Sequence, residues 1–220
     1  MTESTQTRTT ELHVPDAADR ETLSAFVARA VRLDGQCAVR LRNRDAQVVE
    51  AWVVTPFEVL ATRAVHGQIT PRDVTVSGNE LLAALTVAPG ERMDPGPARD
   101  LLWHAELPAG GQWQQVDDLP VEVVGELTDR GVTLARENAG PHGTPPASLM
   151  DQTVLTVSGD DGPQVKIPMR CLFALSGMGF ADSAIAGDVV RVTATSSWLR
   201  LDARYGAVLR RRQALLPLLF

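Results

Sequence analysis

The sequence predicts an α+β fold of two related units, each a helix followed by an antiparallel sheet, with extra helices between them. The main observation is the stretch Val189 to Arg212, VVRVTATSSWLRLDARYGAVLRRR, in which apolar and polar side chains alternate as in half-buried strands. A similar set of three strands is expected over residues 38–63. We interpret the pair as an internal duplication. Chance similarity among strands rich in Arg and Val is the alternative.

A predicted helix precedes each set of strands. Residues 21–33 carry apolar side chains at the spacing of one helix face, with Asp16 or Asp19 as the N-cap. Residues 168–180 are apolar nearly all round, so this helix is expected at the centre of a core. Both units should therefore have the order helix, strand, strand, strand.

The remaining elements are predicted from local signals. Ser77 is expected to cap a short helix that follows a strand at residues 74–76. Asp117-Asp118-Leu119-Pro120 has acids at the positive end of a helix dipole and Pro in the first turn, which predicts a helix from Leu119 to Glu137. Residues 153–157 and 164–167 predict a hairpin.

Loop signals divide the chain. Residues 1–10 are short of large apolar groups and are expected to form a disordered tail. The run APGERMDPGP from Ala88 predicts a boundary, which gives an N-terminal unit of residues 11–90 and a C-terminal unit of residues 91–220.

Composition indicates an ordinary globular protein, with 44% hydrophobic and 22% charged residues. The net charge of −6 gives no general attraction to nucleic acid or to anionic membranes. No signal peptide, membrane span or disulfide framework is predicted, because the start is polar and Cys37 and Cys171 are the only cysteines. A cytoplasmic location is expected.

The charges are unevenly distributed along the chain. The region Glu91 to Asp161 holds 13 acids and 4 arginines, whereas Arg191 to Arg212 holds six arginines and one Asp. We expect the basic end to pack near the acidic middle, in the same chain or in a partner subunit. Two solvated faces of opposite sign are the alternative.

Four segments together resemble a family of uncharacterised actinobacterial proteins. They are PFEVLATR from Pro56, RENAGPHGTPPASLMDQTVLTV from Arg136, PMRCLFALSGMGF from Pro168 and RLDARYGAVLRRR from Arg200. The resemblance implies a free-standing bacterial cytosolic protein. It implies no activity and no functional residues.

Candidate ligand-binding residues are sparse. His142 lies in a Gly/Pro loop near Arg136 and Asp151, where a polar pocket between the two units is expected if the chain binds a small ligand. Cys171 follows Arg170 in the first helical turn, which favours a thiolate, but its apolar neighbours favour a core cysteine. The scattered histidines predict no metal site, and no cofactor motif is present.

Candidate partner contacts lie at the C-terminus. Arg210, Arg211 and Arg212 precede the apolar tail that contains Leu218 and Phe220, which is expected to dock on its own chain or on a partner. We therefore expect a non-enzymatic binding or assembly module that forms a homodimer. A small-ligand carrier or enzyme is the alternative, and nucleic-acid binding through the arginine-rich strands is a weaker one.

Overall fold

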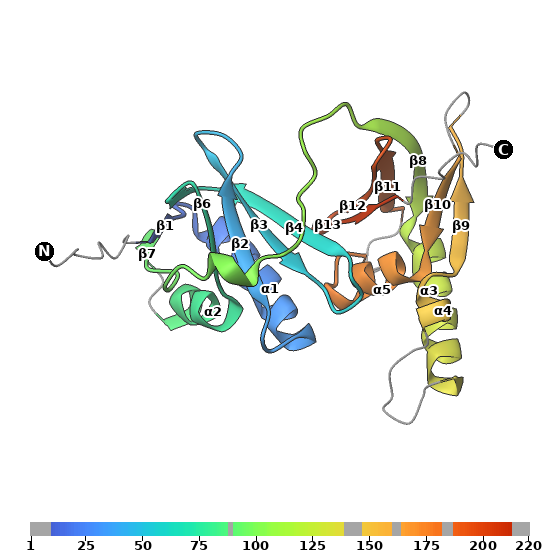
Figure 1. Ribbon diagram of the computed structural model, residues 1–220, viewed down its shortest axis with the longest axis horizontal. Coiled ribbons are helices and arrows are strands. Elements are labelled where there is room, and N and C mark those ends of the chain that lie inside the picture. The colour runs from blue at the N-terminus through green and yellow to red at the C-terminus, as the bar shows by residue number, and fades with distance from the viewer. Residues whose placement is uncertain (1–9, 88–89, 139–146, 160–163, 182–186, 213–220) are drawn as a thin grey trace, which may run out of the picture. The chain divides into compact units, whose positions relative to one another are not determined.

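The computed structural model describes residues 10–87, 90–138, 147–159, 164–181 and 187–212. The predicted disordered tail therefore lies outside the described residues, apart from Thr10. The chain forms two compact units. Unit 1 consists of residues 1–54 and 62–105, and unit 2 of residues 55–61 and 106–220. The α+β class is confirmed, since each unit combines helices with an antiparallel sheet (Figure 1).

Unit 1 contains a four-stranded stretch of sheet in the order β6-β2-β3-β4 and a three-stranded sheet in the order β5-β1-β7. Helices α1 and α2 pack on each other. Its elements are β1 (Glu11–His13), α1 (Ala17–Leu33), β2 (Ala38–Asn43), β3 (Val48–Val54), β4 (Leu60–His66), β5 (Gln68–Thr70), β6 (Asp73–Ser77), α2 (Gly78–Val87), β7 (Arg92–Met93) and the 3₁₀ turn η1 (Asp100–Leu102).

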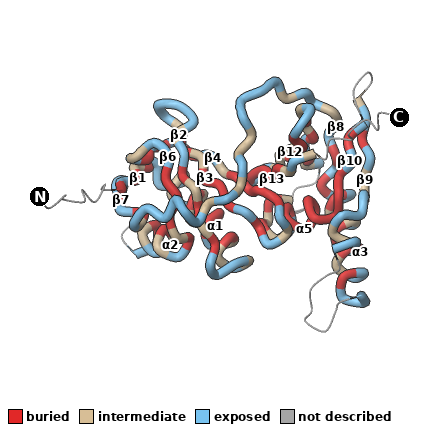
Figure 2. Tube along the Cα trace, viewed as in Figure 1, coloured by how far each residue is buried: buried red, intermediate tan, exposed pale blue. Residues whose placement is uncertain are grey.

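Helix α1 forms where its apolar spacing predicts it. Asp16 is the N-cap, and its carboxylate accepts a hydrogen bond from the Ala18 amide at 2.7 Å. The buried face carries Leu23, Phe26, Val27 and Ala30 (Figure 2). Each large apolar side chain buried there stabilises the fold by about 1.5 to 3 kcal/mol.

Residues 91–105, assigned from the sequence to the C-terminal unit, lie in unit 1. Their contacts with β6 explain this. The Asp100 carboxylate accepts from the Thr75 amide at 2.7 Å, and the Arg99 amide donates to the Thr75 carbonyl at 2.7 Å. Thr10 is also held in unit 1, because its buried hydroxyl donates to the Gly96 carbonyl at 2.7 Å.

Unit 2 contains a four-stranded stretch of sheet in the order β13-β12-β11-β8 and a separate hairpin of β9 and β10. Helices α3 and α5 pack on each other. Its elements are β8 (Gln114–Pro120), α3 (Val121–Glu137), α4 (Ala147–Met150), β9 (Thr153–Val157), β10 (Val165–Pro168), α5 (Met169–Gly177), β11 (Val189–Ala194), β12 (Trp198–Ala203) and β13 (Gly206–Arg211).

The helix predicted from Leu119 to Glu137 begins only at Val121. Residues 117–120 belong to strand β8, which pairs with β11 so that Asp118 lies opposite Arg191 and Leu119 opposite Val190. This pairing buries Leu119 and gives Asp118 an ion pair with Arg191 at 3.2 Å. Tertiary pairing therefore overrides the local helix-start signal.

The two predicted helix-plus-three-strand sets are present. Helix α1 precedes β2, β3 and β4, and helix α5 precedes β11, β12 and β13 (Figure 1). As predicted, α5 is central, since every residue from Met169 to Leu175 is buried. The tryptophans of the two sets occupy different places, because Trp52 is the fifth residue of β3 and Trp198 the first of β12. The shared order of elements therefore does not extend to these side chains.

Candidate functional site

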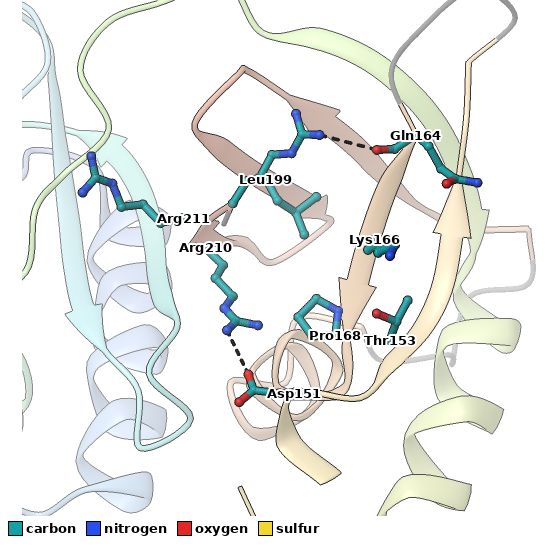
Figure 3. Close-up of a pocket in the computed structure, with 9 residues that line it drawn as sticks. Asp151, Thr153, Gln164, Lys166, Pro168, Leu199, Arg210 and Arg211 are labelled. Atoms are coloured by element: carbon teal, nitrogen blue, oxygen red, sulfur yellow. Dashed lines mark hydrogen bonds and ion pairs between the residues drawn. The ribbon is translucent and has the colours of Figure 1, made fainter. Parts of the chain in front are cut away.

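Unit 2 contains a recess of about 520 Å³ between strands β12 and β13 on one side and the β9–β10 hairpin on the other (Figure 3). On the first wall, Leu199 and Arg210 are cross-strand partners, so their side chains share one face of the sheet. Both line the recess. The volume is in the range of small-ligand sites.

The hairpin provides the second wall. Gln164, Lys166 and Pro168 alternate along the strand and line the recess together, because alternate residues of a strand point to one side. Thr153 is paired with Pro168 and joins them. Lys166 is exposed, whereas Val165 and Ile167 are buried on the other face. The hairpin therefore presents a polar face with one cation at its centre.

An arginine spans the recess at each end. Arg210 donates to the Asp151 carboxylate at 2.9 Å, and Asp151 directly follows α4 (Figure 3). Arg212 donates to the Thr195 carbonyl at 2.7 Å and, more weakly, to the Gln164 carbonyl at 3.4 Å. These contacts join the sheet wall to the hairpin wall, with Lys166 between them.

The charges around the recess leave a positive excess. Arg170, buried in α5, forms ion pairs with Asp151 at 2.8 Å and with Glu58 at 2.5 Å. Four cations (Lys166, Arg170, Arg210, Arg212) thus face two carboxylates (Asp151, Glu58). Among the described residues, Lys166 and Arg212 have no carboxylate within 4.0 Å.

The Asp151 carboxylate is held in its ionised form. Partial desolvation would raise the pKa of Asp151, but hydrogen bonds and charges from Arg210 and Arg170 outweigh it and lower the pKa below its ordinary value. Asp151 therefore stays charged at neutral pH and neutralises part of the arginine charge.

Cys171 lies in the core and does not line the recess. Its side chain is 1% exposed, and burial raises the pKa of its thiol to about 12 although Arg210 and Arg170 act in the opposite direction. Cys37 is also buried, and its pKa is raised to about 11 by desolvation and by Asp34. Neither thiol has the properties of a nucleophile.

The other residues selected from the sequence are dispersed. Arg136 is exposed in the last turn of α3 and is not among the residues that line the recess. His142, Leu218 and Phe220 lie outside the described residues. Arg211 is among the residues that line the recess, but it points away from Lys166 (Figure 3), pairs with Glu106 at 2.9 Å and stacks on Trp198. Of the three pocket candidates that the structure describes, Asp151 lines the recess, whereas Arg136 and Cys171 do not.

The basic end does pack near the acidic middle, within unit 2. Arg191 pairs with Asp118, Arg210 with Asp151, and Arg211 with Glu106. The two remaining pairs of the stretch are local, Arg200 with Asp202 at 2.7 Å and Arg204 with Asp188 at 2.8 Å. Five of its six arginines are therefore neutralised by carboxylates.

Sequence reasoning missed Lys166, Gln164 and the structural part played by Arg170. Lys166 carried a signal, since it is the only lysine among 21 basic residues. Arg170 had a weaker signal, because its charge lies inside a helix that is apolar nearly all round. Buried arginines are rare unless they are paired, which points to partners elsewhere in the chain.

In the part of the chain that the structure describes, no three His, Cys, Asp or Glu side chains come together in a way that could hold a metal ion. No helix there is both long and apolar enough to cross a membrane.

Comparison with protein families divides the chain near the boundary between the units. Residues 7–105 match the family model described as Domain of unknown function (DUF8010), and residues 108–215 match Domain of unknown function (DUF8185). No curated protein matches the sequence.

Solved structures match in fold across both units. A DnaN sliding clamp (DNA polymerase III subunit beta) from Bartonella birtlesii is 12% identical, with a TM-score of 0.56 over 94% of this chain and 66% of that chain. The beta subunit of a Streptococcus pyogenes DNA polymerase is 9% identical, with a TM-score of 0.56 over 92% and 64%. A beta sliding clamp from C. crescentus is 12% identical, with a TM-score of 0.58 over 94% and 66%.

This chain thus spans just under two thirds of the length of those clamps. At such low identity the likeness concerns the fold alone. The chain therefore matches one domain model of unknown function in each of its two parts, in a fold that resembles the bacterial sliding clamps.

Proposed function

We propose that this chain is a non-enzymatic binding or assembly module that works as a homodimer in the cytoplasm. The observation that carries the proposal is the likeness in fold, over more than nine tenths of the chain, to proteins named as subunits of a DNA polymerase. The clamps are longer than this chain by about a third of their own length.

Exposed apolar side chains support self-association. Leu101 is 90% and Leu102 is 55% exposed, next to each other in η1. Two adjacent exposed leucines are typical of a protein contact when further apolar surface lies nearby. The apolar tail with Leu218 and Phe220 lies outside the described residues and stays a second proposed contact.

Light scattering coupled to gel filtration tests this proposal. We expect a mass twice that of the 23.7 kDa chain, and a loss of the dimer when residues 214–220 are deleted or when Leu101 is changed to Asp. Val87→Asp is the matched control, because Val87 is an 81% exposed apolar residue at the end of α2. A full-length protein of monomer mass contradicts the homodimer.

A DNA-associated role is the second candidate, and the names of the matched structures favour it. The ion pairs that the arginines form with carboxylates argue against this role. Arg40 lies 2.7 Å from Asp73, and Arg44, just after β2, lies within 4.0 Å of Asp45 and Glu50. Of these neighbouring arginines, Arg42 alone has no carboxylate within 4.0 Å among the described residues. A gel shift with mixed DNA or RNA at low ionic strength, lost on adding salt, would support this role. The absence of a gel shift would contradict a DNA-associated role.

A further inference from the structure

The recess of unit 2 is a place where positive charge remains after the ion pairs of the described residues are formed. Lys166 stands at its centre and Arg212 at one end, and neither has a carboxylate within 4.0 Å among the described residues. Within the described part of the chain, Arg212 donates only to backbone carbonyls, which carry no net charge. The two side chains together provide two positive charges.

We propose that this recess binds a dianionic phosphate group, free or as a phosphomonoester, between Lys166 and Arg212. A phosphomonoester carries about −1.5 to −2 charges near pH 7, which matches the two positive charges of Lys166 and Arg212. A carboxylate or a phosphodiester carries one negative charge and leaves one cation without a partner. The proposal does not depend on the proposed self-association.

The remaining lining residues suit the same group. The Thr153 hydroxyl and the Gln164 amide are neutral donors on the hairpin wall, and Lys166 supplies three N–H donors. Arg212 adds the planar donor geometry that fits phosphate oxygens. Leu199 and Pro168 provide the apolar part of the lining, against which an organic substituent of a monoester can pack.

Asp151 does not oppose an anion in the recess. Its carboxylate is shared between Arg210 at 2.9 Å and Arg170 at 2.8 Å, so two guanidinium groups surround one negative charge. The Asp151 end is therefore no more negative than neutral. The phosphate is expected beside Lys166, away from this end.

The test is an NMR titration of the ¹⁵N-labelled full chain at pH 8, with ionic strength held constant by sodium chloride. Methyl phosphate should shift the backbone amides of Thr153, Lys166 and Leu199. Dimethyl phosphate and acetate, each a monoanion, should bind at least about tenfold more weakly, because one charge-assisted contact is lost. Equal shifts with all three anions would overturn the proposal.

Three variants localise the binding. Lys166→Gln should weaken methyl phosphate binding about tenfold, and Lys166→Arg should restore most of it. Arg72→Gln is the matched control, since Arg72 is an exposed arginine in the turn between β5 and β6 of unit 1. Equal weakening by Lys166→Gln and Arg72→Gln would show general charge attraction and would reject the site.

Two further probes distinguish the sources of the phosphate group. Inorganic phosphate represents the free anion, and a short oligonucleotide with or without a 5′-phosphate represents a nucleic-acid end. Preference for the 5′-phosphorylated oligonucleotide over the unphosphorylated one supports a terminal monoester. Equal binding of both oligonucleotides indicates recognition of the backbone diester, which contradicts the dianion requirement.

Discussion

The backbone of β13 packs closely against the core of unit 2 at Gly206, so a substitution at Gly206 tests this packing. A Cβ atom added to Gly206 would lie 2.4, 2.5 and 2.8 Å from three ring atoms of Phe180. Phe180 is 1% exposed, so its rigid ring has no free space to enter. Gly206→Ala must therefore displace either the ring or the strand that carries Arg210 and Arg212.

The expected cost follows from these distances. Overpacking a well-packed core usually costs 1 to 3 kcal/mol, and three contacts below 3.0 Å with an aromatic ring place this substitution at the upper end, about 3 kcal/mol. For a chain of this length, 1 kcal/mol corresponds to roughly 2 to 4 °C in Tm, so the loss should be about 6 to 12 °C.

Calorimetry and urea unfolding measure the effect, with two comparisons. Gly125→Ala in α3 has nothing within 4 Å of the added Cβ and should raise stability by about 0.5 to 1 kcal/mol, because Ala is the better helix former. In a double mutant with Phe180→Leu, the cost of Gly206→Ala should fall by at least about 1 kcal/mol. A Gly206→Ala protein as stable as the wild type, or strict additivity with Phe180→Leu, would refute the packing argument.

Three further predictions concern titratable groups. At pH 8 a thiol reagent should leave Cys37 and Cys171 unmodified in the native protein and modify both in urea, because burial raises their pKa values to about 11 and about 12. Since unfolded thiols lose their protons near the ordinary value of 9.0, the unfolded chain binds fewer protons above that pH. The free energy of unfolding should then decrease as pH rises from 9, and less steeply in Cys171→Ala. Asp151→Asn should lower the stability measured by urea unfolding at pH 7, and this difference should disappear as the pH falls below 3.8 through the lowered pKa of Asp151. A difference that does not decrease as the pH falls below 3.8 would mean that the charge of Asp151 is not its cause.

The elements with strong periodicity were predictable from the sequence. Helix α1 has its apolar residues on one face and an Asp cap, and α5 is apolar almost throughout, so both positions and both kinds of burial were expected. The hairpin of β9 and β10 and the strands of the Arg-rich stretch follow from alternation. Local patterns are sufficient where one face of an element meets the core.

Contacts between distant residues account for what the sequence did not reveal. Residues 117–120 have a good helix-start composition, yet they form a strand because Arg191 and Val190, some 70 positions later, pair with them. Residues 91–105 join unit 1 through contacts with residues far away in the sequence, among them the Asp100 carboxylate on the backbone of β6 and the pairing of β7 with β1. The recess forms because β10 and β13 face each other, and their 40-residue separation hides this in the sequence.

The arginines of Val189 to Arg212 differ in role because of strand alternation. Arg210 and Arg211 are neighbours, but they point to opposite faces of β13, one to Asp151 and the other to Glu106 and Trp198. Arg212 returns to the recess face and, among the described residues, meets only carbonyl oxygens. This stretch has five excess positive charges in the sequence, and the ion pairs that the structure describes leave one of its cations, beside Lys166, without a carboxylate. Long-range attraction to a polyanion requires many unpaired charges. A single phosphate group requires only two, so the folded charge distribution favours a small, local anion site over a nucleic-acid track.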